Sequence, residues 1–330
     1  MASISVLGAG SWGTALALLL ARNGHDTVLW GHHPDHVRHL SQERCNRRYL
    51  PDAPFPDTLQ VQADLIEAVR QSPITLIAVP SHAFRDLLIR IRPHLAPAPR
   101  IAWATKGLET DSQRLLHEIV AEEIGQNVDM AVLSGPTFAR EVAANLPTAM
   151  TVASRQAGFA QTLVSLLHNP RFRAYRSEDV IGVQLGGATK NVLAIAAGVA
   201  DGLGFGANAR AALITRGLAE MTRLGLALGG KPETFMGLAG VGDLMLTCTD
   251  NQSRNRRFGL GLGQGLPREQ VTREIGQEIE GIMTARLVYQ LAQRHGIDMP
   301  ITEQTYRILH QGLAPLEAVE NLFLRQPRPE

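Results

Sequence analysis

The first half of the chain alternates short apolar runs with amphipathic segments. The apolar runs predict strands at Ser3–Leu7, Thr27–Trp30, Ile74–Val79, Arg100–Ala104, Met130–Leu133, Ala149–Ala153 and Phe172–Tyr175. Segments with helical periodicity lie between several of these runs, at Leu16–Asn23, Ala83–Ile91, Ser112–Glu123 and Gln156–Leu167. Strands and helices in alternation predict an α/β fold, with a doubly wound (Rossmann) parallel sheet covered by helices on both faces.

The strand pattern stops after about Glu178, and helical patterns follow one another to the end. They predict helices at Val180–Ala200, Ala207–Leu228, Val271–Ile275, Gly281–Arg294, Ile301–His310 and Pro315–Leu324. A length of 330 residues suits two domains of roughly 150 residues each. We therefore expect a dinucleotide-binding Rossmann domain over residues 1–180 and an all-helical, substrate-binding domain over residues 181–330.

Composition narrows the class of protein. Hydrophobic residues make up 45% of the chain and charged residues 19%, which is typical of a folded globular protein. Because 32 basic residues balance 31 acidic ones, no basic field favours nucleic acid as a partner. The apolar stretch 191–200 is too short to cross a bilayer, and the N-terminus has no basic leader, so we expect no membrane insertion. Two isolated cysteines favour a reduced, cytoplasmic setting.

Glycines at three positions follow the first predicted strand with the spacing G-x-G-x-x-G. In this pattern Gly8 permits a tight turn, Gly10 lets the backbone approach a pyrophosphate, and Gly13 lets the helix pack closely on the strand. The free N–H groups and the positive dipole end of the following helix attract phosphate. The strand before and the helix after the motif favour a dinucleotide site over a merely structural glycine turn.

Histidines occupy the position where NAD-specific sites carry a carboxylate. After the second predicted strand the chain has His32 and His33, and these rings together with Arg38 could face a 2′-phosphate. This favours NADP, or dual use of NADP and NAD; the alternative is a solvated turn. His36 and His39 complete a group of four histidines, but we predict no metal because no Cys or Glu completes a ligand shell and Arg38 repels a cation.

Lysine is rare in this chain: only Lys106, Lys190 and Lys231 occur among the 32 basic residues. An ammonium can lose its proton near neutral pH when it is desolvated, whereas a guanidinium cannot. Lys190 stands in an apolar helical run and is the candidate acid/base; the alternative is a lysine that reaches the surface. Lys106 follows a predicted strand at the edge where such sheets bind ligands. We expect Lys231 to be a solvated loop charge.

A candidate anion site follows in the helical half. Asp243 opens an apolar helix, where it either caps the helix or steadies a buried lysine. Ser253, Arg254 and Asn255 offer a hydroxyl, a bidentate guanidinium and an amide that suit a phosphate, although the arginine run 254–257 could instead be an exposed basic face. Because the motifs of serine hydrolases, zinc proteases and P-loop enzymes are missing, hydride transfer with a lysine acid is the chemistry that these groups support.

These residues occur in motifs that resemble the bacterial NAD(P)-dependent glycerol-3-phosphate dehydrogenase family. The resemblance covers nearly the whole chain in the right order. It is carried by the glycine motif and its helix start at 8–17, Ala104-Thr105-Lys106-Gly107-Leu108-Glu109, Ser134-Gly135-Pro136-Thr137-Phe138-Ala139, Lys190-Asn191-Val192, Gly240-Val241-Gly242-Asp243-Leu244 and Ser253-Arg254-Asn255.

The resemblance implies reversible reduction of dihydroxyacetone phosphate to sn-glycerol 3-phosphate, which feeds phospholipid synthesis. It implies Lys190 as acid/base, Lys106 beside substrate and nicotinamide, and Asp243 and Thr247 in the polar network around the reacting carbonyl. Further substrate contacts would be Gly135, Thr137, Ser253, Arg254 and Asn255, and further cofactor contacts Ser11, Trp12, His32, His33, Ala139, Arg254 and Glu280. Thr137 replaces a common serine and keeps its hydroxyl. A homodimer built on the helical domain is also implied.

Two other functions remain open at this stage. One is a related reductase that acts on a 3-hydroxy acid or a sugar acid through its own helical lysine, although such an enzyme has no role for Ser253, Arg254 and Asn255. The other is a non-catalytic module that senses NADP and recruits a protein partner. Lys106 and Lys190 argue against a sensor, because binding alone needs neither of them.

Overall fold

The computed structural model describes residues 2–326, which form two compact units. The first unit contains the described residues up to Glu109 together with Arg114–Val183, and the second contains Thr110–Gln113 and the described residues from Gln184 onward. The division at 183/184 falls inside helix α8 (Val180–Gly202), a few residues beyond the boundary expected from the sequence. The roles assigned to the two parts stay predictions.

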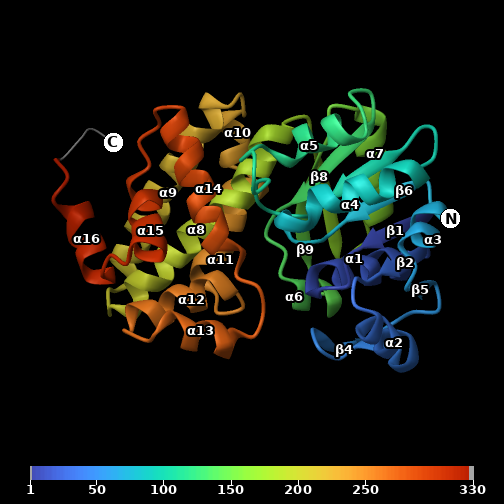
Figure 1. The fold of residues 1–330 in the computed structure, drawn as a ribbon, viewed down its shortest axis with the longest axis horizontal. Helices are drawn as coiled ribbons and strands as arrows, with labels where there is room; N and C mark the ends of the chain where they lie inside the picture. The colour runs from blue at the N-terminus through green and yellow to red at the C-terminus, as the bar shows by residue number, and fades with distance from the viewer. Residues whose placement is uncertain (1, 327–330) are drawn as a thin grey trace. The chain divides into compact units, whose positions relative to one another are not determined.

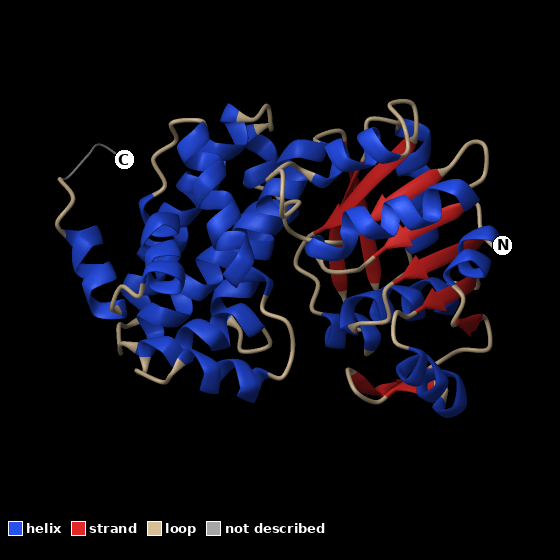
Figure 2. Ribbon diagram, in the orientation of Figure 1, coloured by secondary structure: helices blue, strands red, loops and turns tan. Residues whose placement is uncertain are grey.

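The first unit contains an eight-stranded sheet with helices on both faces, as Figures 1 and 2 show. The strand order is β10-β9-β8-β7-β6-β1-β2-β5. The bounds are β1 (Ser3–Leu7), β2 (Asp26–Trp30), β5 (Leu59–Gln62), β6 (Ile74–Ile77), β7 (Arg100–Trp103), β8 (Asp129–Ser134), β9 (Thr148–Ala153) and β10 (Phe172–Ser177). The predicted Rossmann fold is confirmed, and β5 is a strand that the apolar pattern missed.

One part of the sheet departs from the all-parallel prediction. Strand β9 runs antiparallel to β8, with Val132 opposite Ala153, and β10 then pairs parallel to β9. The physical reason is the connection between β8 and β9. Its helix α6 (Ala139–Ala143) has only five residues and advances the chain by roughly 7 Å. Since a six-residue strand spans roughly 20 Å, this helix alone is too short to return the chain to the start of β8, and the chain enters β9 near the end of β8.

The helices of the first unit pack on the sheet or on a neighbouring helix. They are α1 (Ser11–Arg22), α2 (Pro34–Glu43), α3 (Leu65–Arg70), α4 (Phe84–Ile91), α5 (Leu116–Glu123), α6 and α7 (Ala157–Leu167), with a small antiparallel pair β3 (Cys45–Asn46) and β4 (Leu50–Pro54) after α2. Helix α6 packs on α1, and α5 packs on α4. Helix α5 begins four residues later than predicted. Gln113 adopts a positive φ of 61°, and the Glu118 carboxylate accepts the Leu115 N–H at 2.9 Å, so helical structure begins only after this turn.

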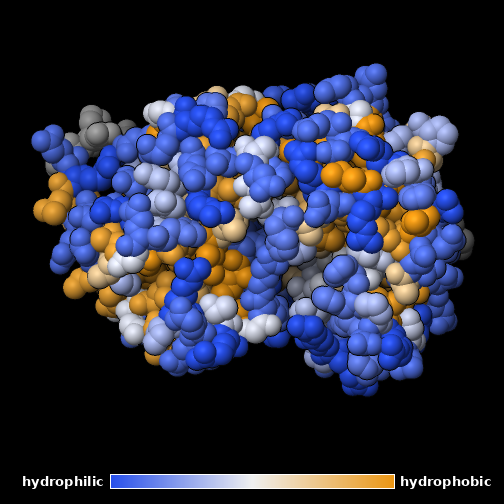
Figure 3. Space-filling model, viewed as in Figure 1, coloured by the Kyte–Doolittle hydropathy of each residue, from blue (hydrophilic) through white to orange (hydrophobic). Residues whose placement is uncertain are grey.

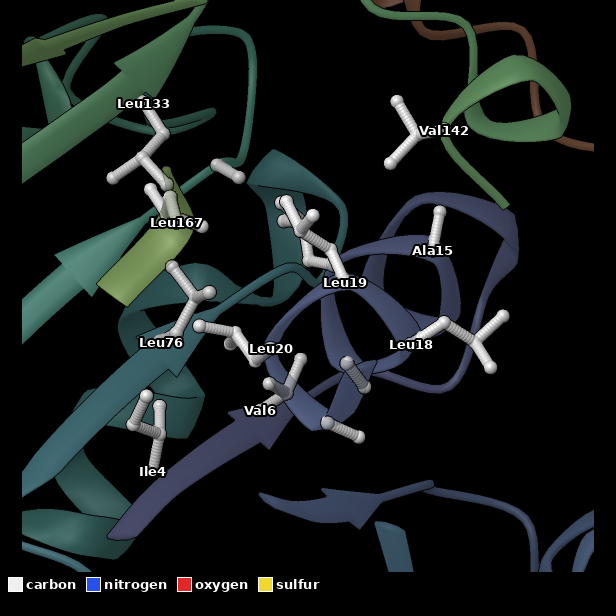
Figure 4. Close-up of a cluster of buried hydrophobic side chains, with 14 of the residues drawn as sticks. Ile4, Val6, Ala15, Leu18, Leu19, Leu20, Leu76, Leu133, Val142 and Leu167 are labelled. Carbon is white, nitrogen blue, oxygen red and sulfur yellow. The ribbon is translucent and has the colours of Figure 1, made fainter. Parts of the chain in front are cut away.

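The hydrophobic core of the first unit surrounds α1, which packs against β1 and other elements of this unit. Figure 4 shows side chains of β1, α1, β6, β8 and α7 pointing toward one another. Within α1 every residue from Gly13 to Ala21 is buried, including Leu18, Leu19 and Leu20. A helix that is buried on all sides keeps its N-terminus in a fixed position relative to the sheet.

The regular secondary structure of the second unit is entirely helical over its described residues. It contains most of α8, then α9 (Ala207–Ala227), α10 (Pro232–Phe235), a π-helical turn (Leu238–Gly242), α11 (Asp243–Thr249), α12 (Arg254–Gly263), α13 (Arg268–Ile275), α14 (Glu280–Arg294), α15 (Pro300–Gln311) and α16 (Pro315–Phe323). Helix α8 is 23 residues long and apolar enough to pass a length and hydropathy test for a membrane span, which the shorter stretch 191–200 did not suggest. Because 89% of its most apolar window is buried inside the protein, we interpret α8 as a core helix.

Helices α8 and α12 cross with their backbones in contact. A Cβ atom added to Gly198 would lie 2.0 Å from the carbonyl oxygen of Arg256, and one added to Gly259 would lie 2.0 Å from that of Ile195. Gly202 and Gly263 form the next pair along the two helices, each with backbone of the other helix closer than 3.0 Å. Only glycine allows this approach, so the crossing sets the start of α12 firmly against the middle of α8.

Most of the surface visible in Figure 3 is hydrophilic, with apolar residues between the polar ones. The most exposed large apolar side chains of the described residues are Phe323 and Leu324, at 79% and 80% exposure. Scattered apolar residues of this kind are ordinary on folded proteins.

Candidate active site

The glycine motif forms the turn between β1 and α1. Gly8 has a φ of +127°, and a Cβ atom there would lie 2.6 Å from the carbonyl oxygen of Ala78 on the neighbouring strand connection. A Cβ atom on Gly13 would lie 1.9 Å from the carbonyl oxygen of Gly8. The tight turn and the close helix–strand packing expected from the motif are therefore both present.

The N-terminus of α1 is open and lacks a side-chain cap. No side chain caps its first turn, the first turn carries no acidic residue, and nothing lies within 4 Å of a Cβ atom added to Gly10. The Trp12 indole Nε1 is buried without a hydrogen-bond partner among the described residues. Open space beside free N–H groups fits the pyrophosphate of a dinucleotide. The turn also lies between β2 and β6, where the strand order reverses and such sheets bind nucleotides.

Two side chains outside the motif, from α2 and from the segment after it, form hydrogen bonds to the glycine turn. The sequence analysis did not predict these contacts. The Asn46 amide donates to the Ala9 carbonyl at 3.1 Å and to the Thr14 hydroxyl at 2.8 Å. His36 also meets the Ala9 carbonyl, with 3.2 Å between its Nε2 and the oxygen. Burial lowers the pKa of His36, which favours the neutral ring. Thus His36, one of the four clustered histidines, contacts the turn. No local pattern signals that Asn46 and His36 meet Ala9.

His32 and His33 follow β2 and are exposed, with their ring centres 4.9 Å apart. Arg38, which the sequence offered as a partner for a 2′-phosphate, forms an exposed ion pair with Asp35 at 2.8 Å. Its charge is therefore partly satisfied within α2. Exposed ion pairs contribute little energy, so this pairing does not prevent Arg38 from meeting a ligand.

Further candidate residues of the first unit follow other strands at the same edge of the sheet. Lys106 is half-buried after β7, which pairs parallel to β6. Gly135 follows β8 with a φ of +149°, and the Thr137 hydroxyl donates to the Gly135 carbonyl at 3.2 Å. Ala139 is the first residue of α6. Because β1, β2, β6, β7 and β8 are parallel, all these residues share the carboxyl edge with the glycine turn.

The second unit contains a buried lysine cluster made of Lys190, Asp243 and Thr247. Lys190 is 7% exposed, which excludes the alternative of a side chain that reaches the surface. Its Nζ donates to Asp243 Oδ1 and, at 2.9 Å, to Thr247 Oγ1. The Thr247 hydroxyl in turn donates to the Asp243 carbonyl at 2.6 Å. Asp243 therefore steadies the ammonium, as one of the two sequence interpretations expected.

Local structure explains how these three side chains meet. Asp243 begins α11 directly after the π-helical turn, a conformation that often marks functional sites. Gly186 of α8 allows this turn to approach, because a Cβ atom there would lie 2.2 Å from the Ala239 carbonyl oxygen. Thr247 lies one helical turn after Asp243, on the same face of α11. Burial raises the pKa of the neighbouring Cys248 thiol to about 12, so this thiol does not exchange protons near neutral pH.

The predicted phosphate site lies at the start of α12 and is hydrogen-bonded to Asn191, the residue that follows Lys190 in α8. The Ser253 hydroxyl accepts the Arg256 N–H at 3.2 Å and so caps α12. Arg254 donates to the Glu278 carbonyl at 2.9 Å. The Asn255 amide donates to Asn191 Oδ1 at 2.9 Å and accepts the Gly281 N–H at 3.0 Å.

Asn191 connects the candidate residues of the second unit. It follows Lys190 in α8, bonds to Asn255, and donates to the Glu280 carboxylate at 3.5 Å. The structure thus brings together all seven candidate residues of this unit, namely Lys190, Asp243, Thr247, Ser253, Arg254, Asn255 and Glu280. Asn191 was not a predicted site residue, although its position beside Lys190 in an apolar run was an available signal.

Comparison with known proteins identifies the family. The model described as the N-terminus of NAD-dependent glycerol-3-phosphate dehydrogenase matches residues 3–160, and the model of the C-terminus matches residues 179–320. The chain belongs to the NAD-dependent glycerol-3-phosphate dehydrogenase family. The family predicted from the sequence motifs is therefore confirmed, and with it an oxidoreductase that uses NAD or NADP.

Relatives of this glycerol-3-phosphate dehydrogenase family match the whole chain. A protein of Methylococcus capsulatus named glycerol-3-phosphate dehydrogenase (NAD(P)+) is 64% identical, over 99% of this chain and 98% of its own length. One of Edwardsiella ictaluri with the same name is 57% identical, over 100% and 98%. The crystal structure of glycerol-3-phosphate dehydrogenase from Coxiella burnetii is 54% identical with a TM-score of 0.96, and covers 98% of this chain and 99% of that one.

Proposed function

We propose that this protein interconverts dihydroxyacetone phosphate and sn-glycerol 3-phosphate, with Lys190 as the acid/base. The observation that carries the proposal is the buried ammonium of Lys190, held by Asp243 and Thr247 in a helical unit that also presents Ser253, Arg254 and Asn255. Because desolvation opposes the attraction within a buried ion pair, the Lys190–Asp243 pair is not explained by stability, and buried charges of this kind are common at functional sites. The names of the relatives supply the substrate.

When bound, the reduced nicotinamide supplies a hydride to C2 of dihydroxyacetone phosphate. The C2 carbonyl oxygen becomes an alkoxide, and Lys190 gives it a proton, so that ketone, hydride and proton together make the alcohol. In the reverse direction the neutral amine accepts the proton. Asp243 and Thr247 hold the Nζ atom in one place while its charge changes. The family resemblance suggests that Lys106 also adds positive charge near this oxygen, which would stabilise the alkoxide electrostatically.

The cofactor is proposed to bind at the carboxyl edge of the first unit. Gly8, Gly10 and Gly13, with Ser11 and Trp12, would hold the pyrophosphate, and His32 and His33 the adenine ribose. Ala139 and, from the second unit, Arg254 and Glu280 complete the proposed contacts, and Gly135 and Thr137 are proposed substrate contacts. His32 and His33 stand directly after β2, where NAD-specific sites carry a carboxylate, and the nearby Asp35 is paired with Arg38. This favours NADP or dual use of NADP and NAD.

The phosphate end of the substrate is proposed to bind at Ser253, Arg254 and Asn255. Of these, Arg254 is the cation, and two parallel N–H groups of a guanidinium match the oxygens of a phosphate. We further propose a cytoplasmic homodimer that supplies glycerol 3-phosphate for phospholipid synthesis. These last features rest on the family alone.

Initial rates with and without the substrate phosphate test this proposal. We expect oxidation of NADPH or NADH to be fast with dihydroxyacetone phosphate and at least about 1,000-fold slower, in kcat/KM, with dihydroxyacetone, since a charged group held by an arginine contributes several kcal/mol. Measuring NADH and NADPH side by side resolves the preference between them. Equal rates with the two ketones, or turnover only of a 3-hydroxy acid or a sugar acid, would rule the proposal out. A protein that binds NADP but shows no substrate-dependent change in nicotinamide absorbance would be a sensor instead.

A further inference from the structure

Arg256 is a buried arginine in the first turn of α12, and it joins three elements of the second unit. Its Nε donates to the Cys248 carbonyl near the end of α11 at 3.1 Å. Its Nη1 donates to the Asn251 side chain in the turn between α11 and α12. Its Nη2 donates to Asp201, near the end of α8, at 2.5 Å. The three nitrogens of one guanidinium therefore connect the end of α8, the end of α11 and the turn between α11 and α12.

The ion pair of Arg256 with Asp201 is buried. Both side chains are 9% exposed, and Asp201 also accepts two hydrogen bonds from Arg210 of α9, at 2.9 and 3.1 Å. A buried ion pair is weak evidence for a gain in stability, because desolvation of both charges opposes their attraction. What such a pair does provide is a defined geometry, since each charge must keep its partner.

The backbone of Arg256 is held as firmly as its side chain. Its carbonyl oxygen lies against Gly198 at the crossing of α8 and α12, where a Cβ atom would be only 2.0 Å away. Its N–H is accepted by the Ser253 hydroxyl that caps α12. Arg256 is thus held against α8, three residues after Ser253, at the start of the helix that carries the proposed phosphate site.

The arginines in this run differ in their surroundings. Arg257 is exposed, whereas Arg256 is buried with partners on all three nitrogens. The sequence left open whether Ser253, Arg254 and Asn255 bind phosphate or the arginines of the run 254–257 form an exposed basic face. Arg256 is buried and therefore does not fit an exposed face. Its guanidinium is aimed at protein groups and not at an open site, so its role in any reaction is indirect.

We propose that Arg256 is a positioning residue that sets the turn Ser253-Arg254-Asn255 at a fixed distance from Lys190. Through Cys248 it holds the end of α11, which carries Asp243 and Thr247, and through Asp201 it holds α8, which carries Lys190. The groups that bind the substrate phosphate would then stay at a constant distance from Lys190, which faces the reacting carbonyl. This inference rests on the proposed function, because it requires that the turn binds the substrate phosphate.

The test replaces Arg256 and compares two ketones that differ only in the phosphate. In Arg256→Lys the charge stays but a single ammonium cannot span three partners. We expect kcat/KM for dihydroxyacetone phosphate to fall about 100-fold, the loss that a displacement of about 1 Å produces, while kcat/KM for dihydroxyacetone changes less than about twofold. Arg257→Lys, one residue further on and exposed, is the matched control and leaves both values unchanged.

A second variant covers the case in which Arg256→Lys does not fold, as judged by thermal unfolding. Asn251→Ala leaves both charges in place and removes only the contact to the turn; we expect kcat/KM for dihydroxyacetone phosphate alone to fall about tenfold, the size of one hydrogen bond to a charged group. Equal losses with both ketones, or no loss in either variant, would overturn the positioning role.

Failure of the proposed function looks different from failure of this inference. If the parent enzyme itself does not prefer dihydroxyacetone phosphate, and Arg254→Ala changes nothing, the phosphate site is elsewhere and both proposals are wrong. If the parent prefers the phosphorylated ketone and Arg254→Ala removes that preference, but Arg256→Lys and Asn251→Ala keep it, only the role of Arg256 is refuted.

Discussion

The glycine turn of the first unit and the lysine cluster of the second are built in opposite ways. The turn is made of backbone. Gly8, Gly10 and Gly13 lie within six residues, and each serves the site because it has no side chain. The cluster is made of side chains that are far apart in the sequence, since Asp243 and Thr247 come 53 and 57 residues after Lys190. A site of the first kind depends on close approach, and one of the second kind on burial and pairing.

This difference predicts how each site responds to substitution. The backbone turn tolerates no added atoms at Gly8 or Gly13, but it carries no charge that must be neutralised. The cluster is more sensitive to the loss of one charge than to a change in side-chain shape. If one charge is removed, its partner stays buried without a counter-ion. The first site is therefore expected to fail through folding alone, and the second through lost chemistry together with some loss of stability.

The largest effect is expected from Lys190→Met, which keeps the length of the side chain and removes its proton. General acid–base catalysis contributes up to about 10⁴-fold, so we expect kcat to fall by about that factor while the Kd for NADPH stays within twofold. Stopped-flow or steady-state absorbance at the nicotinamide band measures the first, and fluorescence titration the second. Lys231→Met, at an exposed lysine, is the control and keeps the parent kcat. Turnover of Lys190→Met at a rate near that of the parent would remove Lys190 from the mechanism.

The same contrast explains how much of the molecule could be predicted from its sequence. The strands, the glycine turn and the Rossmann class follow from local patterns, because β1, the turn and α1 are continuous in the chain. Strand β5 was missed because only Leu59 of its four residues is fully buried, which leaves little apolar signal. Strand β9 was predicted, but its antiparallel direction was missed, because direction depends on the path of the preceding connection and not on the residues of the strand.

For the site, residue types were predictable but contacts were not. The scarcity of lysine pointed to Lys190, and its apolar neighbours pointed to burial, yet nothing local shows that it meets Thr247. The contacts of Asn191 and Arg256 depend on the α8–α12 crossing, whose only trace in the sequence is glycine at four-residue spacing in both helices. The family resemblance supplied the grouping of these residues that local patterns could not.

A pair of glycine variants sharpens the contrast within the turn itself. In Gly13→Ala the added methyl meets the Gly8 carbonyl oxygen, and we expect a loss of at least about 3 kcal/mol in the free energy of unfolding. In Gly10→Ala the methyl enters open space, so we expect a loss below about 1 kcal/mol, together with a rise of roughly 10–100-fold in the KM for the nicotinamide cofactor as the methyl displaces its phosphates. Urea unfolding and steady-state kinetics measure the two quantities. If the two variants lost stability equally, or if Gly10→Ala bound cofactor normally, the assignment of roles within the motif would be wrong.

The smallest effect concerns Glu220, another buried acidic residue of the helical unit, which lies outside the proposed chemistry. Its carboxylate accepts the N–H groups of Ile301 and Thr302 at the start of α15, at 2.6 and 3.1 Å, and burial raises its pKa from 4.5 to about 7. Between these two values the folded chain binds a proton that the unfolded chain does not, so the free energy of unfolding falls as pH rises from 4.5 to 7, by no more than about 3 kcal/mol.

Glu220→Gln cannot ionise and should lack this slope, while it keeps the parent kcat because Glu220 touches none of the proposed reacting groups. Denaturant unfolding at several pH values measures the difference between parent and variant, which cancels the titration of groups common to both. Glu233→Gln, at an exposed carboxylate, retains the parent slope. Parallel pH profiles for the parent and Glu220→Gln would mean that the hydrogen bonds of α15 offset the burial of the charge. Loss of kcat in Glu220→Gln would instead mean that Glu220 of α9 contributes to catalysis. Glu220 could then no longer be described as a buried charge that only joins α9 to α15.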